Sequence, residues 1–187
     1  MSDAFGFTFG FYGLLLGLAL AELATGFSHA YDIRSRRRLG LVAPLFGLLL
    51  IVDLITFWTN AWAYRELADV RFETALAVAL VALLYYFAAT KVFPRDSEHA
   101  SLDDHIMGHR HIVISCVLAS NLLTQIPPAI EAATRPWPAT QIALWATLNI
   151  LYYVLLITAG FARSKRLVIA VTATAIVYVT TATALLS

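Results

Sequence analysis

Charged residues and cysteine are both scarce in this sequence. Only 13% of its 187 residues are Asp, Glu, Lys or Arg, whereas a soluble domain carries about a quarter. The single cysteine, Cys116, excludes an intramolecular disulfide. Both lysines, Lys91 and Lys165, fall at the ends of apolar runs, so no mid-membrane lysine is available for a Schiff base. P-loop, H-E-x-x-H and potassium-filter motifs are missing too, as is an arginine ladder.

Hydrophobic residues are abundant instead, at 60% of the chain. A helix needs about 20 apolar residues to span a bilayer. The pattern predicts an all-α polytopic membrane protein, a single bundle of six transmembrane helices with no soluble domain. The expected helices are about 5–30, 41–63, 74–93, 102–126, 140–162 and 167–186. The start, MSDAFGF, has an acid in place of a positive n-region, so we expect no cleavable signal peptide.

Basic residues are distributed unevenly between the connections. Ten of the 13 lie in the first, third and fifth connections, and three in the second and fourth. The positive-inside rule then predicts that both termini lie outside the cytoplasm. The first connection contains a block of four arginines, which we also expect to contact anionic lipid headgroups. They are Arg34, Arg36, Arg37 and Arg38.

Two carboxylates, Glu22 and Asp53, fall inside apolar runs. Charge within hydrocarbon costs several kcal/mol or more and tends to mark function, so these residues indicate a path for protons or cations. The alternative is that each carboxyl is protonated, or hydrogen-bonded to a Thr, Asn or Tyr, and only pins the bundle. Further polar side chains extend the predicted path through the outer half of the bundle: Asn60, Asn121, Gln125, Gln141 and Asn149.

Histidines cluster on the predicted cytoplasmic side. Ser101 and Asp104 form a capping-box pattern, so a helix should begin near Leu102 and place His105 and His109 on one face. These two histidines could share a transition metal with Asp104 as a third ligand. A haem held by His29 and a later histidine is a second hypothesis, and a pH-sensitive face is a third.

The first helix carries glycines in small-xxx-small spacing, which lets helix backbones approach closely. They are Gly6, Gly10, Gly13 and Gly17. We interpret this face as a packing surface, within the chain or against a second copy, and we expect a homo-oligomer through it.

Several segments resemble a family of small, uncharacterised bacterial membrane proteins. These are LGLALAEL, the RRR block, FWTNAW followed by Arg65, VFP and DDHIMGHRH, which together span roughly residues 16–111. The resemblance implies a six-helix protein of the bacterial inner membrane and brings no activity with it.

The leading functional hypothesis is a small channel or transporter for protons, cations or a small solute, with Asp53 and Glu22 on the path. The alternative is a membrane-embedded accessory subunit whose histidine face holds metal, haem or a partner protein. An embedded enzyme ranks third, because no nucleophile with its base can be assembled. The lipid bilayer is the expected environment, and we expect no nucleic-acid partner.

Overall fold

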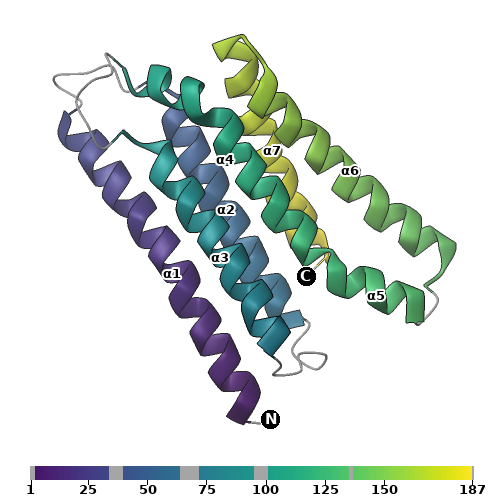
Figure 1. Ribbon diagram of the computed structural model, residues 1–187. Helices are drawn as coiled ribbons and strands as arrows, with labels where there is room; N and C mark the ends of the chain where they lie inside the picture. The colour runs from purple at the N-terminus through teal and green to yellow at the C-terminus, as the bar shows by residue number, and fades with distance from the viewer. Residues whose placement is uncertain (1–2, 34–39, 64–71, 95–100, 135–136, 187) are drawn as a thin grey trace.

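The computed structural model describes residues 3–33, 40–63, 72–94, 101–134 and 137–186, and nearly all of them are helical. This confirms the all-α prediction (Figure 1). The helices in this part of the chain are α1 (Asp3–Asp32), α2 (Val42–Ala63), α3 (Phe72–Val92), α4 (Leu102–Thr124), α5 (Ile126–Thr134), α6 (Ala139–Phe161) and α7 (Lys165–Leu186).

Six helical segments of the described chain are long and apolar enough to cross a membrane, as predicted. The fourth is interrupted. We expected this helix to run to residue 126 and Pro127–Pro128 to break or kink it. In the structure α4 ends at Thr124, Gln125 forms a turn, and α5 begins at Ile126. Pro127 and Pro128 explain the break, because neither has a backbone N–H to continue the ladder of α4, while both are tolerated in the first turn of a new helix.

The helices form a bundle in which α3 lies between α1 and α4, and α2 packs along α7 (Figure 1). α6 lies against both α7 and α4. α2 also touches α1, α3 and α4, and its span has the largest buried share of the six. Any side chain on the inner face of α2 therefore meets several helices at once.

Close helix contacts depend on glycines other than those predicted. A Cβ atom at Gly26 would come within 2.2 Å of the Phe93 ring, and one at Gly47 within 2.7 Å of Phe27. The two phenylalanine rings pack edge to face, with 4.9 Å between centroids. Gly160 of α6 similarly faces Ile114 of α4. The contacts of Gly26 and Gly47 join α1, α2 and the end of α3. The contact of Gly160 joins α6 to α4.

Two adjacent aspartates at the start of α4 tie that end of the bundle together. Asp103 Oδ1 accepts hydrogen bonds from the backbone N–H groups of Val42, at 2.9 Å, and Ala43, at 3.4 Å. It therefore caps the N-terminus of α2, where otherwise unpaired N–H groups need an acceptor. Gly40 makes this possible: its φ is +65°, and a Cβ there would strike the Asp103 carboxylate.

Asp104 joins the same corner to α7. Its backbone N–H donates to Ser101 Oγ at 3.1 Å, which confirms the predicted cap at the start of α4. Its carboxylate pairs with Lys165 Nζ at 2.6 Å, with both side chains about half exposed. An exposed pair of this kind adds little stability, and it shows that the N-terminus of α7 lies beside the start of α4.

Candidate functional site: a carboxylate at the centre of the bundle

Asp53 lies in the middle of α2 (Val42–Ala63) and is only 3% exposed. It is the only acidic residue among the described residues whose side chain is buried in the core. Its neighbours on α2, Leu49, Leu50 and Leu54, are also buried, so Asp53 lies on the side of the helix that faces the core. A carboxyl group surrounded by such residues must find its polar partners on neighbouring helices.

Three helices supply those partners. Tyr85 of α3 donates its hydroxyl hydrogen to Asp53 Oδ2 at 2.6 Å, and the Asn121 side-chain amide of α4 donates to the same oxygen at 2.9 Å. Tyr152 of α6 donates to the other oxygen, Oδ1, at 3.0 Å. The Asn121 amide is held in place by a second bond to the Val117 carbonyl, at 3.0 Å. Asp53 thus connects α2 to α3, α4 and α6.

The partners of Asp53 are hydrogen-bond donors and carry no positive charge. Among the described residues, the hydrogen bonds that stabilise its carboxylate come from Tyr85, Asn121 and Tyr152. An ionised carboxylate accepts hydrogen bonds at both oxygens and donates none, and each oxygen of Asp53 has at least one donor here. Removing a donor would leave a buried acceptor unsatisfied, which is costly in a low-dielectric interior.

Other polar groups surround this centre without completing their hydrogen bonds. The buried hydroxyls of Tyr12, Ser120 and Tyr153 lack a partner within the described part of the chain. Tyr153 lies near the Gln125 side chain but forms no hydrogen bond of normal geometry. Gln125 instead accepts from Trp145 Nε1 at 3.0 Å, so the turn between α4 and α5 is linked to α6.

Comparisons with known proteins identify no relative. The chain matches no protein-family model, no curated protein and no solved structure. The resemblance to a bacterial membrane-protein family therefore stays a prediction, and function has to be argued from the site.

The residues of the predicted path are placed unevenly around Asp53. Asn121 contacts it directly, and Gln125 lies one helical turn further along the chain. Asn149 donates to the Trp145 carbonyl of its own helix at 2.8 Å. Asn60 and Gln141 are exposed. The structure thus brings Asn121 and Asp53 together, and it leaves the other amides as separate polar positions.

Glu22 lies on α1 at the edge of the face that packs against the bundle. Its side chain is half-buried, while the neighbouring Leu23 is completely buried. The groups that hydrogen-bond to Asp53 come from α3, α4 and α6, so Glu22 is not part of that cluster. Whether it shares a path with Asp53 stays a prediction.

The histidines of α4 are engaged with the backbone. His105 Nε2 lies 3.2 Å from the Lys91 carbonyl oxygen, and His109 Nδ1 lies 2.9 Å from the His105 carbonyl oxygen. Their rings stack with 4.4 Å between centroids. In the described part of the chain, no three His, Cys, Asp or Glu side chains are grouped so as to hold a metal. Asp104 is turned toward Lys165, and the metal and haem hypotheses gain no support.

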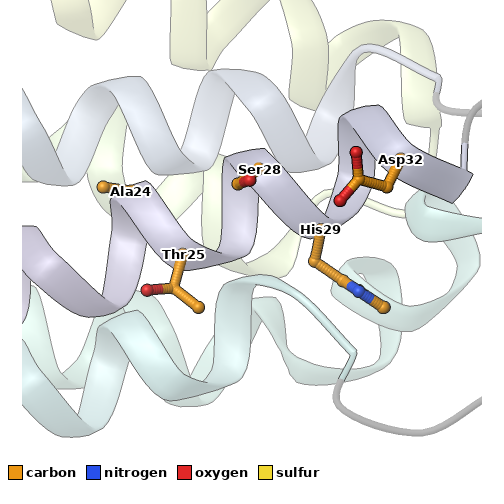
Figure 2. A pocket seen from close by; sticks show the side chains of 5 residues that line it. All are labelled: Ala24, Thr25, Ser28, His29 and Asp32. Atoms are coloured by element: carbon orange, nitrogen blue, oxygen red, sulfur yellow. The ribbon is translucent and has the colours of Figure 1, made fainter.

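His29 lies in an open hollow of about 470 Å³ on the surface of α1. All of its lining residues come from that one helix (Figure 2): Ala24, Thr25, Ser28, His29 and Asp32. A hollow formed by a single exposed helix encloses no ligand, so we assign it no binding role.

The remaining predicted positions concern the surface. Gly6, Gly10 and Gly17 have open space where a Cβ would stand, and Gly13 faces only the Trp58 ring, at 3.5 Å. Apart from the contact of Gly13 with Trp58 of α2, these glycines face no other described helix. The predicted lipid-headgroup residues, Arg34, Arg36, Arg37 and Arg38, lie outside the described residues.

Sequence reasoning named tyrosine as a possible partner of the buried carboxyls but did not single out Tyr85 or Tyr152. Tyr85 and Tyr152 are each the first tyrosine of a similar segment, LLYY in α3 and ILYY in α6. The signal was a tyrosine well inside an apolar run, since a buried hydroxyl there needs a polar partner. A carboxylate at similar depth on another helix was the available partner.

We expect Tyr85→Phe and Tyr152→Phe each to lower the free energy of unfolding by about 1–3 kcal/mol, because each removes a donor from a buried carboxylate. Tyr86→Phe is the matched control in α3, where the side chain is exposed, and Tyr153→Phe is the control in α6, where no hydrogen bond is lost. Unfolding in detergent measures all four variants. Equal stability of Tyr85→Phe and Tyr86→Phe would contradict the importance of the bond.

Proposed function

We propose that the protein is a small membrane channel or transporter for protons, cations or a small solute, and that Asp53 is the central group on its path. One observation carries this proposal: a carboxylate is buried halfway along a spanning helix and has no basic partner among the described residues. Ionisable residues at this depth are costly and mark ion or proton pathways.

The helix break beside the site supports the same proposal. Asn121 bonds to Asp53 one turn before the point where α4 gives way to α5 at Gln125. Transporters often place substrate sites at discontinuous helices, because interrupted backbone leaves polar groups that can serve a ligand. Asp53 is 3% exposed, so passage by this route requires either an opening of the bundle or proton movement through hydrogen-bonded groups.

Flux into liposomes containing purified protein tests the proposal. We expect wild-type protein to move protons or cations down an imposed gradient. Asp53→Asn should reduce that rate about a hundredfold, the size of effect found when a positioned proton-transferring group is removed. Glu22→Gln tests the second predicted path residue. Glu73→Gln is the control, since it removes an exposed acid at the first turn of α3.

Two results of that experiment count against the proposal. Wild-type flux no greater than that of empty liposomes, under gradients of protons, sodium and potassium, would contradict transport of protons and of these cations. Equal flux from wild type and Asp53→Asn would remove Asp53 from the path. Matching gel-filtration profiles of the two proteins would show that folding is not the cause.

We further propose that the protein lies in a bacterial inner membrane with both termini outside the cytoplasm, on the strength of the distribution of basic residues. In a Cys116→Ala background, Ser164→Cys and Thr140→Cys place exposed thiols at the two ends of α6. A membrane-impermeant maleimide added to intact spheroplasts should label Thr140→Cys, and Ser164→Cys only after permeabilisation. The reverse pattern would invert the topology.

A homo-oligomer through α1 is the remaining part of the proposal, supported by the open glycine face. Gly10→Leu and Gly17→Leu should shift the purified protein toward the monomer, because a bulky side chain keeps two backbones apart. Gly108→Leu is the control, at an α4 glycine that also faces open space. Light scattering coupled to gel filtration measures the mass. A wild type that is monomeric at all concentrations in detergent and in nanodiscs would contradict the proposal.

A further inference from the structure

We infer that, in the conformation of this structure, the transported species reaches Asp53 from one end of the bundle only, and that the Tyr153 hydroxyl is the group it meets before Asp53. The route starts at the end formed by α5 and the start of α6, which we call the α5 end. We call the opposite end, where Asp103 caps α2, the capped end. The inference rests on the proposed transport function, and it holds equally for a proton, a cation or a small solute.

The core between Asp53 and the capped end is apolar and closely packed. Phe46 and Leu50 of α2 are completely buried there, as are Ile114 of α4 and Leu156 of α6. Hydrocarbon side chains in contact leave no room for water and offer a polar species no hydrogen bonds. This layer therefore closes the route from Asp53 toward the capped end.

Buried polar side chains do not bridge that layer. Apart from tyrosines, the polar or charged side chains buried in the described part of the chain are Asp53, Ser120 and Thr172. Ser120 adjoins Asn121, which contacts Asp53 directly. The Thr172 hydroxyl of α7 has no hydrogen-bond partner among the described residues, so it continues no chain of polar groups.

Polar contacts also hold the capped end together. Asp103 binds the first backbone N–H groups of α2, Asp104 pairs with α7, and His105 Nε2 lies 3.2 Å from a carbonyl oxygen in the last turn of α3. Three helices are thus attached to the first turn of α4. Opening the bundle at this end would break several of these contacts as well as the apolar layer.

Packing is much looser on the other side of Asp53. No residue is buried in segments 55–61 of α2, 72–80 of α3 or 139–151 of α6. Tyr152, a hydrogen-bond donor to Asp53, is the first buried residue of α6. Asp53 therefore lies where the closely packed part of the bundle ends, and the loosely packed part extends from it to the α5 end.

Tyr153 connects Asp53 with this looser part. Its hydroxyl is buried and has no hydrogen-bond partner in the described part of the chain. The Gln125 side chain lies near it, and Asp53 lies within electrostatic range. An unpartnered hydroxyl is costly in a dry interior, whereas a water molecule or a polar substrate beside it would complete its hydrogen bonds. The hydroxyl thus marks a position on the route between Gln125 and Asp53.

The turn at Gln125 forms the outer part of the route. α4 ends there, and α5 turns away from the line of α4 (Figure 1). Gln125 accepts a hydrogen bond from Trp145 Nε1 at 3.0 Å, which links the turn to a segment of α6 without buried residues. Separating the turn from α6 would break this bond and leave the closely packed core intact.

Cysteine labelling tests the route without requiring flux. In a Cys116→Ala background, Gln125→Cys and Tyr153→Cys place thiols on the route, and Thr140→Cys marks the membrane face at the α5 end. A charged, membrane-impermeant methanethiosulfonate is added to intact spheroplasts or to inside-out membrane vesicles of the full-length protein. We expect both route thiols to react from the face that labels Thr140→Cys and from that face only.

Three thiols away from the route serve as controls. Val154→Cys is beside Tyr153, but the native side chain is 53% exposed on the surface of α6. The route thiols should react at least about tenfold faster than this one, because the thiolate is the reactive form and apolar surroundings suppress it. Ala159→Cys and the native Cys116 of the wild type lie in the closely packed core and should react from neither face.

Tyr153→Phe gives a second test that leaves the fold intact. The hydroxyl has no hydrogen bond to lose, so the free energy of unfolding should match wild type. Flux into liposomes should fall about tenfold, the equivalent of one hydrogen bond missing along the route. Tyr86→Phe, at an exposed position of α3, should keep wild-type flux. Wild-type flux in Tyr153→Phe would remove this hydroxyl from the route.

The outcomes separate this inference from the transport proposal. Flux that depends on Asp53, with Gln125→Cys and Tyr153→Cys unlabelled in proteins of wild-type gel-filtration profile, would overturn the route and leave transport standing. Labelling of Ala159→Cys or Cys116 from either face would overturn the closed layer. The expected labelling without flux of any ion would support the one-sided opening and contradict transport. The absence of both labelling and flux would overturn both.

Discussion

The structure depends on satisfying one buried carboxylate. Asp53 sits where water cannot reach it, so its oxygens must be paired within the bundle. Its partners come from α3, α4 and α6, and each must approach within 3.0 Å of one side chain on α2. That requirement fixes the depth and rotation of all four helices. In a bilayer it carries extra weight, because lipid tails are as apolar as leucine and apolar contact alone hardly selects one arrangement.

A second set of polar contacts holds the opposite end of α4. Asp103 caps α2 and Asp104 pairs with Lys165 of α7, so this helix is attached through its first turn as well as through Asn121. Apolar and aromatic contacts, such as Phe27 against Phe93, pack α1 against the bundle, and Gly6, Gly10 and Gly17 face open space. The polar network therefore organises the inner helices, while α1 covers one side of them.

The sequence was sufficient to predict the helices and to single out Asp53 as an acidic residue inside one of them, because both follow from local patterns. Apolar runs of spanning length and a charge inside one of them need no knowledge of neighbours. The capping of α4 by Ser101 was equally local. The hydrogen-bond donors to Asp53 could not be predicted in the same way. Which side chains contact Asp53 depends on how the helices are rotated and paired, and six helices have many possible arrangements. The break near Gln125 could be predicted from Pro127 and Pro128. The short helix α5 that follows could not, because its formation depends on contacts with the rest of the bundle.

The tyrosine pairs show why the missing part was hard to see. LLYY in α3 and ILYY in α6 resemble one another, but the sequence alone assigns neither segment a partner. In the structure, the first tyrosine of each pair reaches a different oxygen of the same carboxylate. The second tyrosines have different surroundings, since Tyr86 is exposed and Tyr153 lies near Gln125. The shared pattern thus reflects one common requirement, a donor at the depth of Asp53. A search for such a site should begin from the carboxylate and ask which donors lie at its depth.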